Sequence, residues 1–168
     1  MADPAAGGAI LGEACHFVDL FYWLLESEII SVSAFCLPAG RTDPVGENNM
    51  AASFRFADGS VANLTYCTVG SRTSGGERVE VFAQGLACMC EDFKRLSGKT
   101  RFGHEVSRWF PEKGYDMQMR EFVKAVRTGG APSVSVRDGA RATLACLRML
   151  ESARTLRTCD LDLDAALE

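Results

Sequence analysis

The segment MAASFRFADGSVANLTY (residues 50–66) decides the fold. Its first half alternates between apolar and other residues, with Phe54 and Phe56 on one side, and the pair Asp58-Gly59 separates it from a second β-rich run. An Asp-Gly pair between alternating runs is the strongest short-range signal for a β-hairpin. The segment therefore predicts two antiparallel strands joined by a tight turn.

Further strands are predicted on both sides of this hairpin. A β-branched and aromatic run at 29–37 precedes it, and a second hairpin follows around Gln84-Gly85, with strands at 78–83 and 86–92. Residues 93–101 are expected to add one or two more strands. Hairpin connections make neighbouring strands antiparallel, whereas parallel pairs need long crossovers. We therefore expect an open, mostly antiparallel sheet of about five to six strands.

Helices are predicted before and after the strands in the sequence. Apolar residues at helical spacing predict one helix over about 10–26, a second around 119–126 that ends at Gly129-Gly130, and a third from a cap at Asp138 to about Arg154. Strands grouped between helices indicate an α+β fold with the helices packed on one face of the sheet. Since no linker or internal repeat divides the chain, we expect a single domain over residues 1–168.

Composition and charge exclude several classes of protein. The chain has 168 residues, with 18 Lys+Arg against 22 Asp+Glu, and this mild acidity argues against a nucleic-acid partner. No apolar run reaches the roughly 20 residues of a membrane-spanning helix, and the first eight residues do not resemble a secretion signal. Seven cysteines without a CxxC pair favour a reduced, cytoplasmic protein.

His16 is the candidate catalytic residue. It lies in the segment GGAILGEACHFVDL (7–20), with Glu13 about one helical turn before it and Asp19 three residues after it. Two carboxylates near an imidazole can tune it for proton transfer near neutral pH. The same pattern also suits a histidine at the edge of the core whose N–H groups find local acceptors, and both interpretations stay open. The second histidine, His104, is interpreted as a loop residue.

Other ligand sites are not expected from the residue pattern. Two carboxylates and one imidazole on one helix are too few ligands for a metal site. Cys88 and Cys90, on one face of a predicted strand, are interpreted as small buried hydrophobic residues. Neither GxGxxG nor GxxxxGK[ST] occurs in the sequence, so no fingerprint for a nucleotide phosphate is present and the cofactor-binding residues are unknown.

The segment 7–20 resembles the Gfo/Idh/MocA family of NAD(P)-dependent oxidoreductases, in its C-terminal, substrate-binding half. The similarity continues through RFADGSVANLTY (55–66), GERVEVFAQG (76–85), EKGYDMQMREFVKAVRTGG (112–130) and ARATLACLRMLESA (140–153). The resemblance implies an α/β domain with an open, mostly antiparallel sheet, which follows an N-terminal Rossmann domain in the family. It further implies that the open sheet forms the oligomer interface and that the helix-lined side faces the cofactor.

The resemblance also implies roles for the candidate residues. His16 matches the histidine of the family pattern GGxxxxDxGxHxxD, near the nicotinamide and the substrate carbinol, where it transfers a proton or holds the substrate hydroxyl. Asp19 matches the final Asp, a structural anchor. The chain departs from the pattern at Gly12, where the family often has Asp, and at Ala14, where it has Gly. Glu13, beside Gly12, is then the candidate carboxylate partner of His16.

The expected function is the substrate-binding and oligomerisation half of an NAD(P)-dependent dehydrogenase, without turnover by the isolated chain. Its expected substrate is a secondary alcohol or ketone of a sugar, inositol or related polyol. NAD or NADP, a homo-oligomer through the open sheet face, and a Rossmann domain as partner are implied by the family. One alternative is a non-catalytic assembly module that dimerises through its sheet, and a further one is a metal-dependent lyase or hydrolase built around His16.

Overall fold

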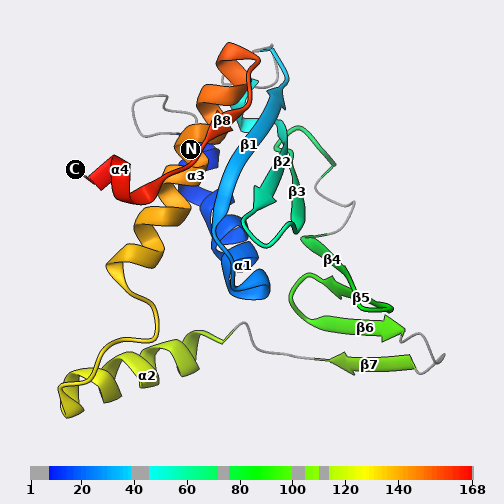
Figure 1. Ribbon diagram of the computed structural model, residues 1–168. Coiled ribbons are helices and arrows are strands. Elements are labelled where there is room, and N and C mark those ends of the chain that lie inside the picture. Colours follow the sequence, from blue (N-terminus) through cyan, green and yellow to red (C-terminus); the bar gives the residue numbers. More distant parts are fainter. Residues whose placement is uncertain (1–7, 39–45, 72–75, 100–104, 110–113, 168) are drawn as a thin grey trace. The chain divides into compact units, whose positions relative to one another are not determined.

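A computed structural model describes five stretches of the chain, residues 8–38, 46–71, 76–99, 105–109 and 114–167 (Figure 1). The chain forms two compact units, Met1–Gly70 with Val134–Glu168, and Ser71–Ser133. Within the described stretches no helix combines the length and the apolar character needed to cross a membrane. The expectation of a single domain is not tested by this division and stays a prediction. The first seven residues, where no secretion signal is predicted, and His104 lie outside the described residues.

The first unit is built on a four-stranded antiparallel sheet in the order β3-β2-β1-β8. Its strands are β1 (Ile29–Cys36), β2 (Met50–Phe56), β3 (Val61–Tyr66) and β8 (Cys159–Asp160). The predicted hairpin is confirmed, because β2 and β3 pair in unbroken register. Gly59 in its turn takes a φ of 89°, the left-handed region that glycine adopts most easily.

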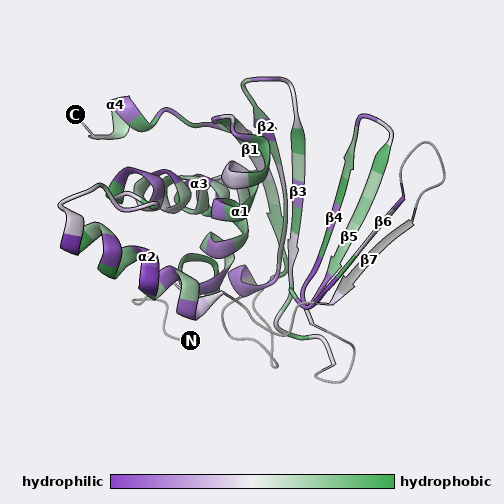
Figure 2. Ribbon diagram, turned by 90° about the horizontal axis from the view of Figure 1, so that it is seen from below, coloured by the Kyte–Doolittle hydropathy of each residue, from purple (hydrophilic) through white to green (hydrophobic). Residues whose placement is uncertain are grey.

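Two helices cover one face of this sheet (Figures 1 and 2). A π-helical turn (Ile10–Ala14) runs into α1 (Cys15–Leu25), and α3 (Val136–Thr155) packs against both α1 and β1. The short helix α4 (Leu163–Leu167) follows β8. Alternate residues of β2 face this helical layer and are buried. The largest fully buried side chains of this core are Ile10, Val18, Val32, Phe54, Phe56, Cys146 and Met149.

A buried hydroxyl ties α3 to the central strand. Ser152 is 1% exposed, and its Oγ accepts a hydrogen bond from the Ala34 amide (2.9 Å) and donates one to the Arg157 carbonyl (2.6 Å). A buried polar group costs free energy unless it is paired, and this hydroxyl is paired as donor and as acceptor. The helix end and the turn that leads to β8 are thereby fixed on β1.

The second unit has its own antiparallel sheet, in the order β4-β5-β6-β7. Its elements are β4 (Arg78–Ala83), β5 (Leu86–Glu91), β6 (Arg95–Lys99), β7 (Glu105–Trp109) and helix α2 (Tyr115–Thr128). The register gives one face apolar residues such as Val81 and Cys88 and the other face charged residues such as Glu80. Outside residues 105–108, none of the described residues of this unit is buried.

The α+β class, the antiparallel pairing and the helical cover of one sheet face are confirmed. The strand count differs from the expected five or six in one sheet, since the described residues form eight strands in two sheets. The hairpin around Gln84-Gly85 is present, with both turn residues at positive φ. Local periodicity identifies strands but not which edges pair, and the two-residue β8 is too short to show any period.

Candidate functional site

The helical segment that carries His16 is anchored at its start. The Ala9 amide donates a hydrogen bond to Asn48 Oδ1 (2.8 Å), and both residues are buried. This contact satisfies one of the amides that a helix leaves unpaired at its N-terminus. Asn48 belongs to a short 3-10 helix (Gly46–Asn48), in which Glu47 forms a bidentate ion pair with Arg154 of α3. The Arg154 guanidinium lowers the pKa of the Glu47 carboxyl.

The three predicted site residues lie on this one helical segment. His16 is exposed, whereas Glu13 and Asp19 are half-buried. Burial raises the pKa of the neighbouring Cys15 thiol, and the negative charges of Glu13 and Asp19 add to the rise. Within the described residues no ion pair joins His16 to either carboxylate. The structure therefore keeps the imidazole open to solvent, on the same helical segment as the two carboxylates, and the roles of these residues stay predictions.

A π-helical turn precedes His16, which sequence periodicity does not indicate. It spans Ile10–Ala14 and includes both Gly12 and Glu13. π-Helical turns inside α-helices are rare and occur frequently at functional sites. Gly12 is exposed, and a Cβ atom added there would meet no atom within 4 Å. The position one turn before His16 thus has room for a side chain.

We predict that Gly12→Asp leaves the free energy of unfolding unchanged or raises it by up to about 0.5 kcal/mol. Glycine is the poorest helix former after proline, and a carboxylate near a helix N-terminus is favourable. Gly59→Asp is the matched control, because its site is equally open but its φ is 89°. That control is expected to lose about 1 kcal/mol. Urea unfolding followed by circular dichroism measures both, and a larger loss for Gly12→Asp than for the control would contradict the open site.

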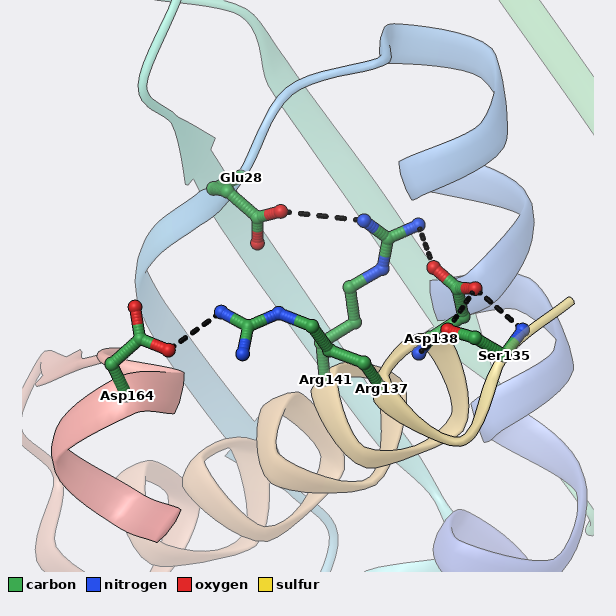
Figure 3. A network of polar contacts seen from close by, with 6 residues as sticks. All are labelled: Glu28, Ser135, Arg137, Asp138, Arg141 and Asp164. Atoms are coloured by element: carbon green, nitrogen blue, oxygen red, sulfur yellow. Dashed lines mark hydrogen bonds and ion pairs between the residues drawn. The ribbon is translucent and has the colours of Figure 1, made fainter. Parts of the chain in front are cut away.

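A polar network at the start of α3 was not expected from the sequence (Figure 3). Arg141 contacts Glu28 (3.3 Å) and Asp138 (3.0 Å), and its guanidinium lies 4.4 Å from the centre of the Tyr22 ring. Burial raises the pKa of the Tyr22 hydroxyl. This network joins the end of α1 to α3, so it stabilises the helix that carries His16 rather than forming a site itself.

The cap of α3 differs from the expectation. Asp138 is predicted as the capping residue, but Ser135 occupies the N-cap position and Asp138 completes a capping box with it. The Asp138 amide donates to Ser135 Oγ, and the Ser135 amide donates to the Asp138 carboxylate (2.7 Å). The Ser135 hydroxyl also donates to the Asp138 carboxylate (2.7 Å), and this bond together with the one from the Ser135 amide lowers the pKa of the Asp138 carboxyl. The Ser-x-x-Asp spacing in the sequence is the local pattern that indicates this capping box.

The described cysteines and acidic residues offer no metal centre. No three His, Cys, Asp or Glu side chains converge among the residues that the structure describes. All seven cysteines are free, and burial raises the pKa of Cys146 to about 12, so its thiol stays neutral. Cys88 and Cys90 are half-buried rather than buried.

Two surface hollows lie away from the predicted site residues. One, of about 660 Å³, lies at the end of α3 and is lined by Arg148, Glu151, Thr155, Arg157, Thr158, Cys159 and Asp160. The other, of about 430 Å³, lies on α2. His16, Glu13 and Asp19 line neither of them.

This arrangement of helices and antiparallel strands is the fold of a group of solved oxidoreductases. An oxidoreductase from Desulfitobacterium hafniense, described as NADPH-dependent, is 17% identical with a TM-score of 0.79, and the match covers 99% of this chain and 52% of that chain. Aldose-aldose oxidoreductase from Caulobacter crescentus in complex with glycerol is 18% identical with a TM-score of 0.74, and the match covers 88% of this chain and 45% of that chain. An Agrobacterium radiobacter oxidoreductase in complex with NAD+, L-tartaric acid and magnesium is 14% identical with a TM-score of 0.72. That match covers 92% of this chain and 48% of that chain.

The chain belongs to the GFO/IDH/MocA family, because the sequence model of the GFO/IDH/MocA C-terminal domain matches residues 1–85. This region includes α1 and the first hairpin. The resemblance inferred from the sequence is thereby confirmed. No curated protein sequence matches the chain. The chain spans about half the length of the solved structures that it matches.

Proposed function

We propose that the chain supplies the substrate-binding half of an NAD(P)-dependent dehydrogenase of the cytoplasm. The observation that carries this proposal is that the family match contains the helical segment 10–25, in which an exposed His16 has Glu13 and Asp19 within about one turn in the sequence. The similar Agrobacterium protein binds NAD+ and the similar Caulobacter protein is an aldose-aldose oxidoreductase in complex with glycerol. These likenesses support a secondary alcohol or ketone of a sugar, inositol or related polyol as the substrate.

In this proposal the work of the chain is proton transfer and orientation. A nicotinamide cofactor supplies hydride chemistry when bound, but the described residues include no glycine-rich strand-to-helix turn that fits a dinucleotide pyrophosphate. We therefore assign cofactor binding to a Rossmann partner domain. The exposed His16 imidazole gives or takes the proton of the substrate oxygen. Glu13 is its carboxylate partner, and Asp19 anchors the helix.

A non-catalytic assembly module is the second candidate function. It is favoured by the outer face of the first unit's sheet, where Phe35 and Val61 are 67% and 62% exposed. The register puts Ser33, Ser53 and Asn63 between them on the same face. Such a face, on which exposed apolar side chains lie beside small polar ones, suits pairing with a second copy of the sheet. In both candidate functions we assign homo-oligomerisation to this face.

Two binding experiments test the proposed function. Titration of the purified chain with NADH and NADPH, followed by nicotinamide fluorescence and by quenching of Trp23 and Trp109, is expected to show no saturable binding. A hybrid in which this chain replaces the matching half of the Desulfitobacterium oxidoreductase is expected to bind NADPH and to turn over a member of a panel of aldoses, ketoses and inositols. Saturable dinucleotide binding by the chain alone would contradict the assignment of cofactor binding to a separate Rossmann domain. A folded, NADPH-binding hybrid without turnover on the whole panel would favour the assembly module.

A further inference from the structure

The buried face of the helical segment that carries His16 keeps a spacing of four residues. Ile10, Ala14, Val18 and Tyr22 lie on it, and each is at most 3% exposed. In a regular α-helix, residues four apart differ by about 40° around the axis, so a face with this spacing drifts away from the core. The π-helical turn Ile10–Ala14 holds more residues per turn and offsets this drift. The π turn therefore keeps the first residues of the segment directed into the core.

The π turn is held at both of its ends. At the end that leads into α1, Ala14 is 0% exposed in the core. Immediately before the turn, Ala9 is 2% exposed, and its amide donates a hydrogen bond to Asn48 Oδ1 (2.8 Å). A buried amide that loses its acceptor costs free energy, because water does not reach it to replace the bond. The Asn48 side chain is thus the polar contact that fixes the chain where the π turn begins.

Asn48 is itself held firmly by the residues on either side of it. Its side chain is 6% exposed. The preceding residue, Glu47, accepts a hydrogen bond from Arg154 Nη2 of α3 (2.7 Å). The following residue, Asn49, accepts one from the Thr68 amide just after β3 (2.8 Å). The segment 47–49 therefore joins α3, the end of β3 and the start of the His16 segment, and it presents the Asn48 carboxamide from a fixed support.

We infer that Asn48 is a positioning residue for His16, which acts through the π turn. The inference rests on the proposed function, in which His16 transfers the proton, and it adds the residue that sets the orientation of the segment. Without the bond to Ala9, the π turn can relax to a regular helical turn. Such a change shifts the hydrogen-bond register by one residue, which turns the chain before His16 by about 100° relative to it. Glu13, the candidate carboxylate partner, lies within that turn.

Amide hydrogen exchange of the isolated chain, followed by NMR, tests the positioning directly. Asn48→Leu removes the acceptor and keeps a side chain of similar size. The amides of residues 9–14 are expected to exchange at least about tenfold faster in this variant, relative to the amides of β2, which report the overall stability of the first unit. Asn48→Asp retains an acceptor oxygen beside the unpaired amides of a helix start, so it is expected to restore slow exchange.

Ser152→Ala is the matched control. It also removes a buried hydrogen bond, from the Ala34 amide to Ser152 Oγ, but neither partner belongs to the His16 segment. Its exchange is expected to rise by the same factor in residues 9–14 and in β2. If Asn48→Leu leaves too little folded protein, Asn48→Ser serves instead with the same expectation, because its hydroxyl is too short to reach the Ala9 amide.

Steady-state kinetics of the hybrid with the Desulfitobacterium protein give a second readout. Asn48→Leu is expected to lower kcat about tenfold with little change in KM, because a displaced proton-transfer group slows the chemical step more than it weakens substrate binding. Asn48→Asp is expected to recover most of the lost rate. Ser152→Ala is expected to keep kcat within about twofold of the wild-type hybrid.

Two results would overturn the inference. One is exchange in residues 9–14 that stays unchanged relative to β2 in Asn48→Leu. The other is an equal loss of kcat for Asn48→Leu and Ser152→Ala, which would show a general loss of stability rather than positioning. The exchange measurement needs neither cofactor nor substrate. Faster exchange together with a wild-type hybrid that does not turn over would therefore contradict only the proposed function, and an active hybrid with unchanged exchange would contradict only the role of Asn48.

Discussion

Replacing Phe54 with alanine is expected to lower the free energy of unfolding by about 3–5 kcal/mol. Phe54 lies in the middle of β2, is 0% exposed, and its ring meets the edge of Phe21 with centroids 5.9 Å apart. Truncation removes the buried ring and leaves a cavity between the sheet and the helices, which the packed core fills only in part. Equilibrium unfolding in urea, followed by circular dichroism, measures the loss.

Phe35→Ala is the matched control for this prediction. The same side chain is removed from the neighbouring strand β1, but Phe35 is 67% exposed on the outer face of the sheet. Its loss is expected to cost less than about 1 kcal/mol. If Phe54→Ala leaves too little folded protein to measure, Phe54→Leu serves instead, with an expected cost of about 1–2 kcal/mol. Equal losses at the two positions would contradict the assignment of the core to the helix-covered face.

The parts of the fold that depend on neighbouring residues are predictable from the sequence. Asp58-Gly59 and Gln84-Gly85 identify both hairpins because a tight turn needs residues that accept positive φ. The division of the strands between two sheets is not predictable in this way. It depends on which strands pair with one another, and side-chain alternation within a strand contains no information about that pairing.

The candidate site shows the same division between local and distant signals. His16 stands out because histidine is scarce and carboxylates flank it in the sequence. The contact from Asn48 to the start of that helix spans 39 residues, and the Arg141–Glu28 pair spans 113, so no spacing rule reveals either. Only the capping box of α3, Ser135 with Asp138, has a readable local pattern.

His16→Gln is expected to lower the turnover of the hybrid dehydrogenase by about a hundredfold or more, with little change in KM. Glutamine retains a polar group of similar reach but does not titrate, so it removes proton transfer and leaves hydrogen bonding to the substrate oxygen. Because His16 is exposed, the free energy of unfolding is expected to change by less than about 0.5 kcal/mol. Steady-state kinetics with NADPH and urea unfolding measure the two effects separately.

The pH dependence of turnover separates proton transfer from simple positioning. A general acid or base makes turnover of the wild-type hybrid depend on its protonation state, so His16→Gln is expected to remove one limb of the pH–rate profile. A His16→Gln hybrid that retains both the rate and the limb would show that this histidine does not transfer the proton. The exposed imidazole on α1 would then be a surface residue, and the outer sheet face would be the main functional surface of the first unit.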